Sequence, residues 1–175
     1  MRVSEQLRSA IRDIPDFPKP GILFRDITPV LNDPVLFRAA IAEFVKGCRE
    51  ADAQRIAGID ARGFLFGATV AHELGLGFVP IRKKGKLPFR TICQSYDLEY
   101  GSSEVEVHTD AFAKGERVVL IDDLLATGGT AGAAVKLIEL AGAHVVKAQF
   151  LIELADLGGR ALLPGIPVTS IVCYS

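Results

Sequence analysis

Two adjacent carboxylates, Asp122 and Asp123, stand between an apolar run and a turn of small residues. The run over 118–121 is continuous and β-branched, as in a parallel strand that is covered on both faces. Glycines and threonines follow over 126–130, and an alanine-rich stretch with helical spacing begins at Thr130. A strand, a small-residue loop and a helix in this order are typical of a pocket that binds a phosphorylated sugar.

The loop over 126–130 has little side-chain bulk, so a ligand can reach its backbone. Gly128 and Gly129 are expected to adopt positive φ at little steric cost. Their amides and those of the first helical turn would bind an anion with help from the helix dipole. The predicted phosphate-binding residues are Ala126, Thr127, Gly128, Gly129 and Thr130.

Two common phosphate-binding motifs are excluded. A P-loop ends in Gly-Lys-Ser/Thr, but no lysine lies between Asp123 and Lys136. The dinucleotide fingerprint has glycines at a fixed spacing that this loop lacks. The alternative to a phosphosugar site is a helix-capping turn with incidental acids.

Asp122 and Asp123 are expected to do separate work. Successive residues of an extended chain point to opposite faces, which argues against a proton-sharing pair. One carboxylate would accept hydrogen bonds from a sugar diol and the other would hold a hydrated Mg²⁺. We therefore predict that both are catalytic and that they bind the metal, Mg²⁺, through water.

Composition limits the classes of protein that the chain can represent. A length of 175 residues with 49% hydrophobic residues predicts a single globular domain over 1–175. The formal net charge of −1 argues against a nucleic-acid binder. An odd number of cysteines, 3, predicts a reducing, cytoplasmic setting. Early charges argue against a signal peptide, and no apolar stretch is long enough for a membrane span.

The predicted elements alternate between strands and helices, which indicates an α/β fold with an open parallel sheet. Polar or glycine-rich turns follow Ile59, Ile81 and Ile121, where such sheets bind ligands. The spacing of apolar residues, prolines and glycines predicts helices over 3–14, 34–50, 63–74 and 130–141 and strands over 55–59, 78–81, 118–121 and 145–152.

Cations follow two of these strands. Arg62 could bind two phosphate oxygens at once, or its stem could simply cover a helix start. Residues 82–86 contain four cations, which are either a solvated charge run or a capture site for a multiply charged anion.

Residues 121–130 resemble the phosphoribosyl-pyrophosphate (PRPP) motif of the type I phosphoribosyltransferases, in the version found in the branch that acts on adenine. The resemblance continues in the family's order along nearly the whole chain, at 15–21, 24–29, 61–67, 82–88 and 96–101. It implies a Rossmann-like open parallel sheet with helices on both faces. The core would span about 35–150, and a small hood would be formed by residues 1–34 and 151–175.

The resemblance also implies an activity: transfer of the 5-phosphoribosyl group from PRPP to adenine, giving AMP and pyrophosphate, with Mg²⁺ as cofactor. The small-molecule partners would be adenine and PRPP, and the enzyme would be a homodimer. A different nucleobase, such as a 6-oxo purine, is the first alternative. The second, a non-catalytic PRPP-binding regulator, is disfavoured by the short N-terminal arm and the slight net acidity.

The family's motifs assign roles to individual residues. Glu99 would act as a general acid or base, although it could equally be a surface acid in a mobile segment. A catalytic loop from Lys83 to about Val107 would close over PRPP. Phe24 would stack on the purine, unless it is only a hydrophobic anchor. The implied pyrophosphate-binding residues are Arg62, Lys83, Lys86 and Tyr100, with Arg62 also catalytic, and the implied adenine-binding residues are Leu23, Phe24, Arg25 and Leu154.

Overall fold

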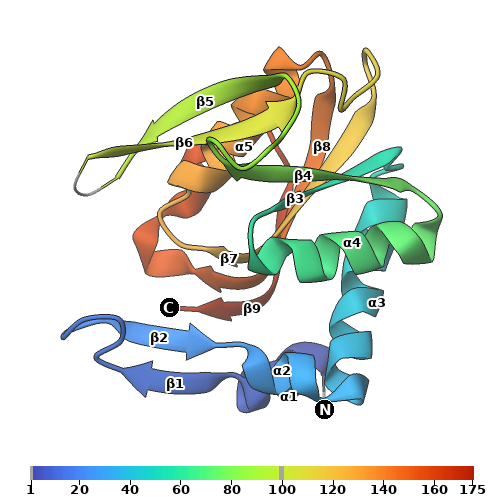
Figure 1. The fold of residues 1–175 in the computed structure, drawn as a ribbon. Helices are drawn as coiled ribbons and strands as arrows, with labels where there is room; N and C mark the ends of the chain where they lie inside the picture. Colours follow the sequence, from blue (N-terminus) through green and yellow to red (C-terminus); the bar gives the residue numbers. More distant parts are fainter. Residues whose placement is uncertain (1, 99–100) are drawn as a thin grey trace.

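The structure of the protein is a computed structural model, in which residues 2–98 and 101–175 are described. Its main sheet has seven strands in the order β5-β6-β4-β3-β7-β8-β9 (Figure 1). The strands of the main sheet are β3 (Arg55–Ile59), β4 (Gly77–Lys83), β5 (Thr91–Asp97), β6 (Ser102–His108), β7 (Arg117–Leu125), β8 (His144–Leu154) and β9 (Val168–Tyr174). The helices are α1 (Val3–Ala10), α2 (Thr28–Asn32), α3 (Pro34–Glu50), α4 (Arg62–Leu74) and α5 (Gly129–Leu140).

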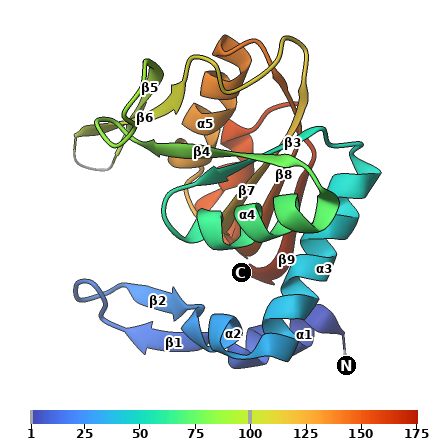
Figure 2. The ribbon, with the colours of Figure 1, turned by 45° about the vertical axis from the view of Figure 1, so that its right-hand side comes forward.

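Five strands of the sheet, β4, β3, β7, β8 and β9, are parallel, and β6 and β5 join antiparallel at one edge. The helices α1, α3 and α4 pack on one face, around Phe44, Phe66 and Ile121. On the other face α5 and β6 pack around Leu120, Leu137 and Phe150. The predicted open parallel sheet with helices on both faces is therefore confirmed, and α4 and α5 lie on opposite sides of the central strands in Figure 2. Within the described chain, no helix is long and apolar enough to cross a membrane.

The predicted ends of the central helices follow from local chemistry. The side chain of Asp33 accepts hydrogen bonds from the amides of Val35 and Leu36 at 2.8 and 3.2 Å, so it caps α3 before its first-turn proline. Helix α4 ends at Gly75, which has the left-handed φ of 65° that glycine adopts without steric cost.

The prediction of one helix over residues 3–14 is wrong. Helix α1 ends at Ala10, and β1 (Arg12–Pro15) pairs antiparallel with β2 (Leu23–Asp26) in a separate two-stranded sheet. This hairpin lies below the main sheet in Figure 1, near the end of β9. Apolar spacing alone did not distinguish the last helical turn from a strand that pairs with a segment further along the chain.

The segment from Lys83 to about Val107, where the resemblance implies a catalytic loop, contains regular structure. It contains the antiparallel ribbon of β5 and β6, in which Thr91 pairs with His108 and Asp97 with Ser102. Val105 and Val107 of β6 are buried, and Arg82 of β4 pairs with Glu106. A hairpin thus extends the sheet beside the end of β4.

The ring of Tyr174, in β9, connects the N-terminal hairpin to the main sheet. The guanidinium carbon of Arg25 lies 3.9 Å from the centre of this ring, and that of Arg8 lies 4.5 Å from it. Arg8 also donates a hydrogen bond to the carbonyl of Cys173. Cation–π contacts of this kind fix the hairpin against the last strand.

Asp26 closes the hairpin at the start of α2. The residue is 9% exposed, and its side chain accepts hydrogen bonds from the amide of Thr28 at 2.9 Å and from the Thr28 hydroxyl at 2.8 Å. The Thr28 amide is the main cause of a lowered pKa for Asp26, and the Thr28 hydroxyl and Arg12 act in the same direction against the opposing effect of burial.

We predict that Asp26→Asn lowers thermal stability at neutral pH and that this loss shrinks in acid. The folded pKa lies below the unfolded value of about 3.9, so the carboxylate stabilises the fold above that pH and stops doing so as the pH falls through the folded pKa. Melting temperatures of both proteins from pH 7 to pH 3 give the test. A loss that stays constant over this range would contradict the assignment.

Candidate functional site

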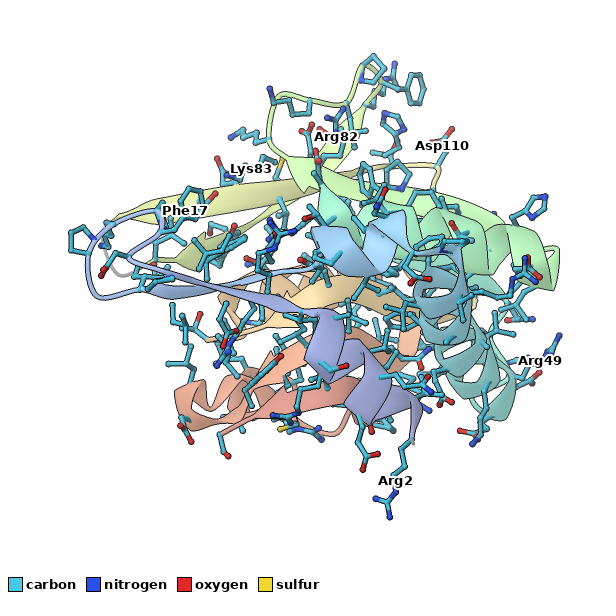
Figure 3. The ribbon with its side chains drawn as sticks, turned by 90° about the horizontal axis from the view of Figure 1, so that it is seen from below. Arg2, Phe17, Arg49, Arg82, Lys83 and Asp110 are labelled. Atoms are coloured by element: carbon cyan, nitrogen blue, oxygen red, sulfur yellow. The ribbon has the colours of Figure 1, made fainter. Side chains whose placement is uncertain are left out.

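A cavity of about 390 Å³ opens at the carboxyl ends of β3, β4 and β7. The three strand ends expected to face a ligand therefore meet at one place. Arg82 and Lys83, the last two residues of β4, both line this cavity, and Figure 3 shows them close together. The polar and glycine residues that line it are Asp60, Arg62, Arg82, Lys83, Tyr96, Asp122, Asp123, Thr127, Gly128, Gly129 and Thr130.

The loop over 126–130 lines the cavity along its whole length. Gly128, the residue that caps α5, has the expected positive φ of 85°. Gly129 does not, because the helix already begins there. A Cβ at Gly129 would lie 3.4 Å from the ring of Tyr96, an ordinary van der Waals distance, so Gly129 lies next to this ring.

Two helix N-termini face this cavity. Neither Ala61 at the start of α4 nor Gly128 at the start of α5 makes a side-chain hydrogen bond to its helix. The amides of each first turn have no partner within the helix, and the helix dipole places partial positive charge at the same point. The cavity therefore receives two positive poles, which suits a ligand with two anionic groups.

Gly63 allows the start of α4 to lie against the end of β7. A Cβ at Gly63 would lie 2.8 Å from Oδ1 of Asp122 and 3.0 Å from the carbonyl oxygen of Ile121. The start of α4 can approach the end of β7 this closely only because residue 63 has no side chain.

Strand β7 extends further than the sequence indicated and includes both acids. Both residues are part of the cavity lining despite the alternation along the strand, and the amide of Asp123 donates to Oδ1 of Asp122 at 2.8 Å. The pKa of Asp122 is raised well above its ordinary value by burial and, next, by the negative charge of Asp123. An excess of negative charge on hard oxygen ligands suits a hydrated Mg²⁺.

Within residues 2–98 and 101–175, no three His, Cys, Asp or Glu side chains gather into a metal site. Asp122 and Asp123 alone supply too few ligands for an all-protein site. They suit a metal that arrives with oxygen ligands from substrate and water.

The two arginines of the cavity lining are paired with its acids. Arg62 Nε donates to Oδ2 of Asp123 at 2.5 Å, and Arg82 Nε donates to Oδ2 of Asp60 at 2.7 Å. Each guanidinium has further N–H groups that can bind a ligand. Lys83 also lines the cavity and is exposed.

Lys86, a predicted pyrophosphate ligand, does not line the cavity, whereas Arg62 and Lys83 do. It lies in the turn after β4, where its amide donates to Oε1 of Glu106 at 3.0 Å and its carbonyl accepts from Arg82 at 3.3 Å. Glu99 and Tyr100 lie outside the described residues.

The predicted adenine-binding residues are not among those that line the cavity. The ring of Phe24 is 5.7 Å from the guanidinium carbon of Arg62 and makes an edge contact with Phe17. The side chain of Arg25 is held by Asp13 and Tyr174, so its backbone is the part left for a base. Leu154 ends β8 and pairs with Tyr174 in β9.

Asp60, Arg82 and Tyr96 line the cavity, but sequence reasoning did not select them as site residues. Arg82 belongs to the cation cluster over 82–86, and Asp60 lies two residues before Arg62. The opposite charges of Asp60 and Arg82 are the sequence feature that could have indicated their ion pair. Nothing in the local pattern placed Tyr96 against Gly129, since that contact depends on the pairing of β5 with β6.

Comparison with known proteins gives a consistent result. Residues 34–160 match the model of the phosphoribosyl transferase domain family. A protein of Parvibaculum lavamentivorans named adenine phosphoribosyltransferase is 59% identical over 162 residues, which cover 93% of each chain.

Solved structures with the same name agree. The adenine phosphoribosyltransferase of Thermoanaerobacter pseudethanolicus has a TM-score of 0.94 at 49% identity, covering 97% of this chain and 99% of its own. The Saccharomyces cerevisiae enzyme, solved with an imino-altritol bisphosphate and adenine, has a TM-score of 0.92 at 40% identity, covering 97% and 98% of the two chains. The chain therefore belongs to the phosphoribosyltransferase family.

We predict that Gly63→Ala destabilises the protein although alanine favours a helix by about 1 kcal/mol. The new methyl group would overlap Asp122 and the Ile121 carbonyl, which costs about 1–3 kcal/mol and displaces the carboxylate. Chemical denaturation measures the change. A Gly63→Ala protein at least as stable as the wild type would contradict the close contact.

Proposed function

We propose that this chain transfers the 5-phosphoribosyl group of PRPP to adenine, releasing AMP and pyrophosphate. The observation that carries this proposal is the cavity in which two uncapped helix N-termini flank a pair of carboxylates. Its family membership and the shared name of its relatives support the same activity. The bond from C1′ of the ribose to pyrophosphate is broken with its electron pair leaving on the pyrophosphate, the bond from C1′ to the purine nitrogen is formed, and the proton of that nitrogen is released.

The 5′-phosphate binds at the start of α5. The amides over 126–130 and the hydroxyls of Thr127 and Thr130 supply donors, and the helix dipole stabilises the dianion. The absence of a side-chain cap at Gly128 supports this assignment, because a ligand takes the place that a capping side chain would occupy.

The pyrophosphate binds at the start of α4, between Arg62 and Lys83. The positive charge of these two side chains stabilises the negative charge that builds on the leaving group. Arg62 can contribute through the N–H groups that its bond to Asp123 leaves over. The family motif alone supports pyrophosphate binding by Lys86 and Tyr100 and general acid or base catalysis by Glu99.

Asp122 and Asp123 lie between the two anion sites and serve the ribose hydroxyls and a hydrated Mg²⁺. When bound, the metal would supply Lewis-acid stabilisation of the diphosphate. The carboxylates hold the sugar where positive charge develops on its ring, and the chain supplies no nucleophile. Its contribution is to orient the two substrates and complement the charges of the transition state.

Adenine binds between Phe24 and Leu154, above the ribose. The 5.7 Å separation of the Phe24 ring from Arg62 places this ring at the border of the cavity. The backbone of Leu23 and Arg25 reads the edge of the base. A 6-oxo purine would call for a cationic donor at its oxygen, and none of Leu23, Phe24 and Leu154 can supply one.

The remaining assignments concern the protein as a whole. We propose a single catalytic domain over 1–175, in which the hairpin of β1 and β2 and the C-terminal segment form a hood over the base. We also propose a homodimer that works in the cytoplasm without nucleic-acid or membrane partners.

The direct test of this function is a panel of bases with PRPP and Mg²⁺. We expect AMP from adenine and little or no nucleotide from hypoxanthine, guanine or a pyrimidine, because only adenine presents an amine at the sixth position. Chromatography of the products measures each rate. Equal rates with hypoxanthine would move the chain to another branch of the family, and no product with any base would reject the enzyme assignment.

We predict that Asp123→Asn lowers kcat/KM by roughly 100-fold, because it removes a charge near the reacting sugar and releases Arg62. Steady-state kinetics with adenine and PRPP provide the measurement. Asp110→Asn is a matched control, since Asp110 is exposed and lies outside this cavity. Equal kinetics for the two variants would remove Asp123 from the mechanism.

A further inference from the structure

The loop over 126–130 rests on a second glycine, Gly159, which is far from it in sequence. Gly159 begins the short 3-10 helix η2 (Gly159–Leu162), after η1 (Ala155–Leu157). It is buried, although Gly158 and Arg160 on either side are exposed. A Cβ at Gly159 would lie 2.5 Å from the carbonyl oxygen of Ala126 and 3.1 Å from the amide nitrogen of Gly128.

The contact is reciprocal. A Cβ at Gly128 would lie 2.3 Å from the carbonyl oxygen of Gly159. Two backbones therefore pack directly against each other, with no side chain between them. Backbone atoms cannot move aside as the end of a flexible side chain does, so any added methyl group must displace the loop itself.

Conformation does not explain the glycine at position 159. Gly128 and Gly158 have positive φ, at 85° and 67°, whereas Gly159 does not. Any residue could adopt the backbone of Gly159 without the strain that positive φ imposes. The space taken by Ala126 and Gly128 is what excludes a side chain there.

An ion pair fixes this support to the sheet. Arg160 donates to both carboxylate oxygens of Glu153, at 2.6 and 2.7 Å, and to the carbonyl of Val168 at 3.0 Å. Glu153 is 5% exposed and pairs in register with Leu125, the residue before the loop. Bidentate arginine–carboxylate pairs are strong and geometrically specific. This pair therefore fixes the position of η2 relative to the end of β7.

The same turn also contacts the helix that the loop begins. A Cβ at Gly132, in the first turns of α5, would lie 3.0 Å from the carbonyl oxygen of Leu162. The 3-10 helix η2 is thus packed against both the loop and the helix that supply the amides.

We propose that Gly159 is a positioning residue that sets the place of the phosphate-binding amides, and that the Glu153–Arg160 pair holds Gly159 in position. The inference rests on the proposed function, because the ligand of these amides is taken to be the 5′-phosphate of PRPP. Anion sites built from amides require accurate placement, and a displacement of about 1 Å can cost on the order of 100-fold in rate.

The test compares Gly159→Ala with two control substitutions. We expect Gly159→Ala to raise the KM for PRPP by roughly tenfold or more and to leave the KM for adenine within about twofold of wild type. The controls are Gly158→Ala and Gly165→Ala, at positive φ of 67° and 75° with no atom within 4 Å of the added Cβ. They introduce backbone strain without the contact and should leave the KM for PRPP near the wild-type value.

A second series covers the case in which Gly159→Ala does not fold. Arg160→Lys keeps the charge but loses the bidentate geometry, and Arg160→Gln loses both. We expect the KM for PRPP to rise from wild type to Arg160→Lys to Arg160→Gln, while the KM for adenine stays the same. Thermal melting shows that each variant is folded at the assay temperature.

Three results would overturn the inference. The first is a Gly159→Ala enzyme with the KM of wild type for PRPP, and the second is an equal rise in Gly158→Ala. The third is a rise in both KM values together in either series, which would indicate general damage. A wild-type protein that forms no AMP from adenine and PRPP would instead reject the proposed function, so the two failures are distinguishable.

Discussion

The site depends on the convergence of two helix N-termini, neither of which has a side-chain cap. Helices α4 and α5 begin directly after the ends of β3 and β7, neighbouring parallel strands, so their positive poles face one cavity. Neither helix start has a capping side chain, and in α4 the amide of Phe64 donates to the carbonyl of Ala61 at 3.2 Å. An anion is the ligand that suits the remaining first-turn amides. This arrangement requires backbones to approach closely, which explains why Gly63, Gly128 and Gly159 lie at its contacts.

The charges around these helix ends are balanced within the free protein. Arg62 is paired with Asp123, and Arg82 with Asp60, so the cations are held in place before any substrate arrives. Burial and, next, the negative charge of Asp123 raise the pKa of Asp122, because the surroundings do not fully compensate a second negative charge at this position. A divalent cation accompanying an anionic substrate would supply that compensation, and the arginines would then be available to the phosphates.

Much of this site could be predicted because its elements are defined by short, local patterns. Buried strands such as 118–121, the Asp33 cap and the stop at Gly75 each follow from adjacent residues. The errors involve partners that are distant in sequence. Strands β1, β5, β6 and β9 form through pairing that the apolar spacing does not specify. The pyrophosphate-binding role of Lys86 stays a prediction, since this residue lies outside the lining of the cavity and its amide donates to Glu106. The sequence does not indicate the role of Gly159, since its neighbours at Ala126 and Gly128 come close to it only in the folded chain.

A crystal structure of the protein with AMP tests the central claim most directly. The account predicts that the phosphate lies at the start of α5, with its oxygens at hydrogen-bonding distance, about 2.7–3.2 Å, from amides over 127–130. It also predicts that the base lies against Phe24. A nucleotide bound with its phosphate away from this loop, and with those amides still facing solvent, would contradict the account.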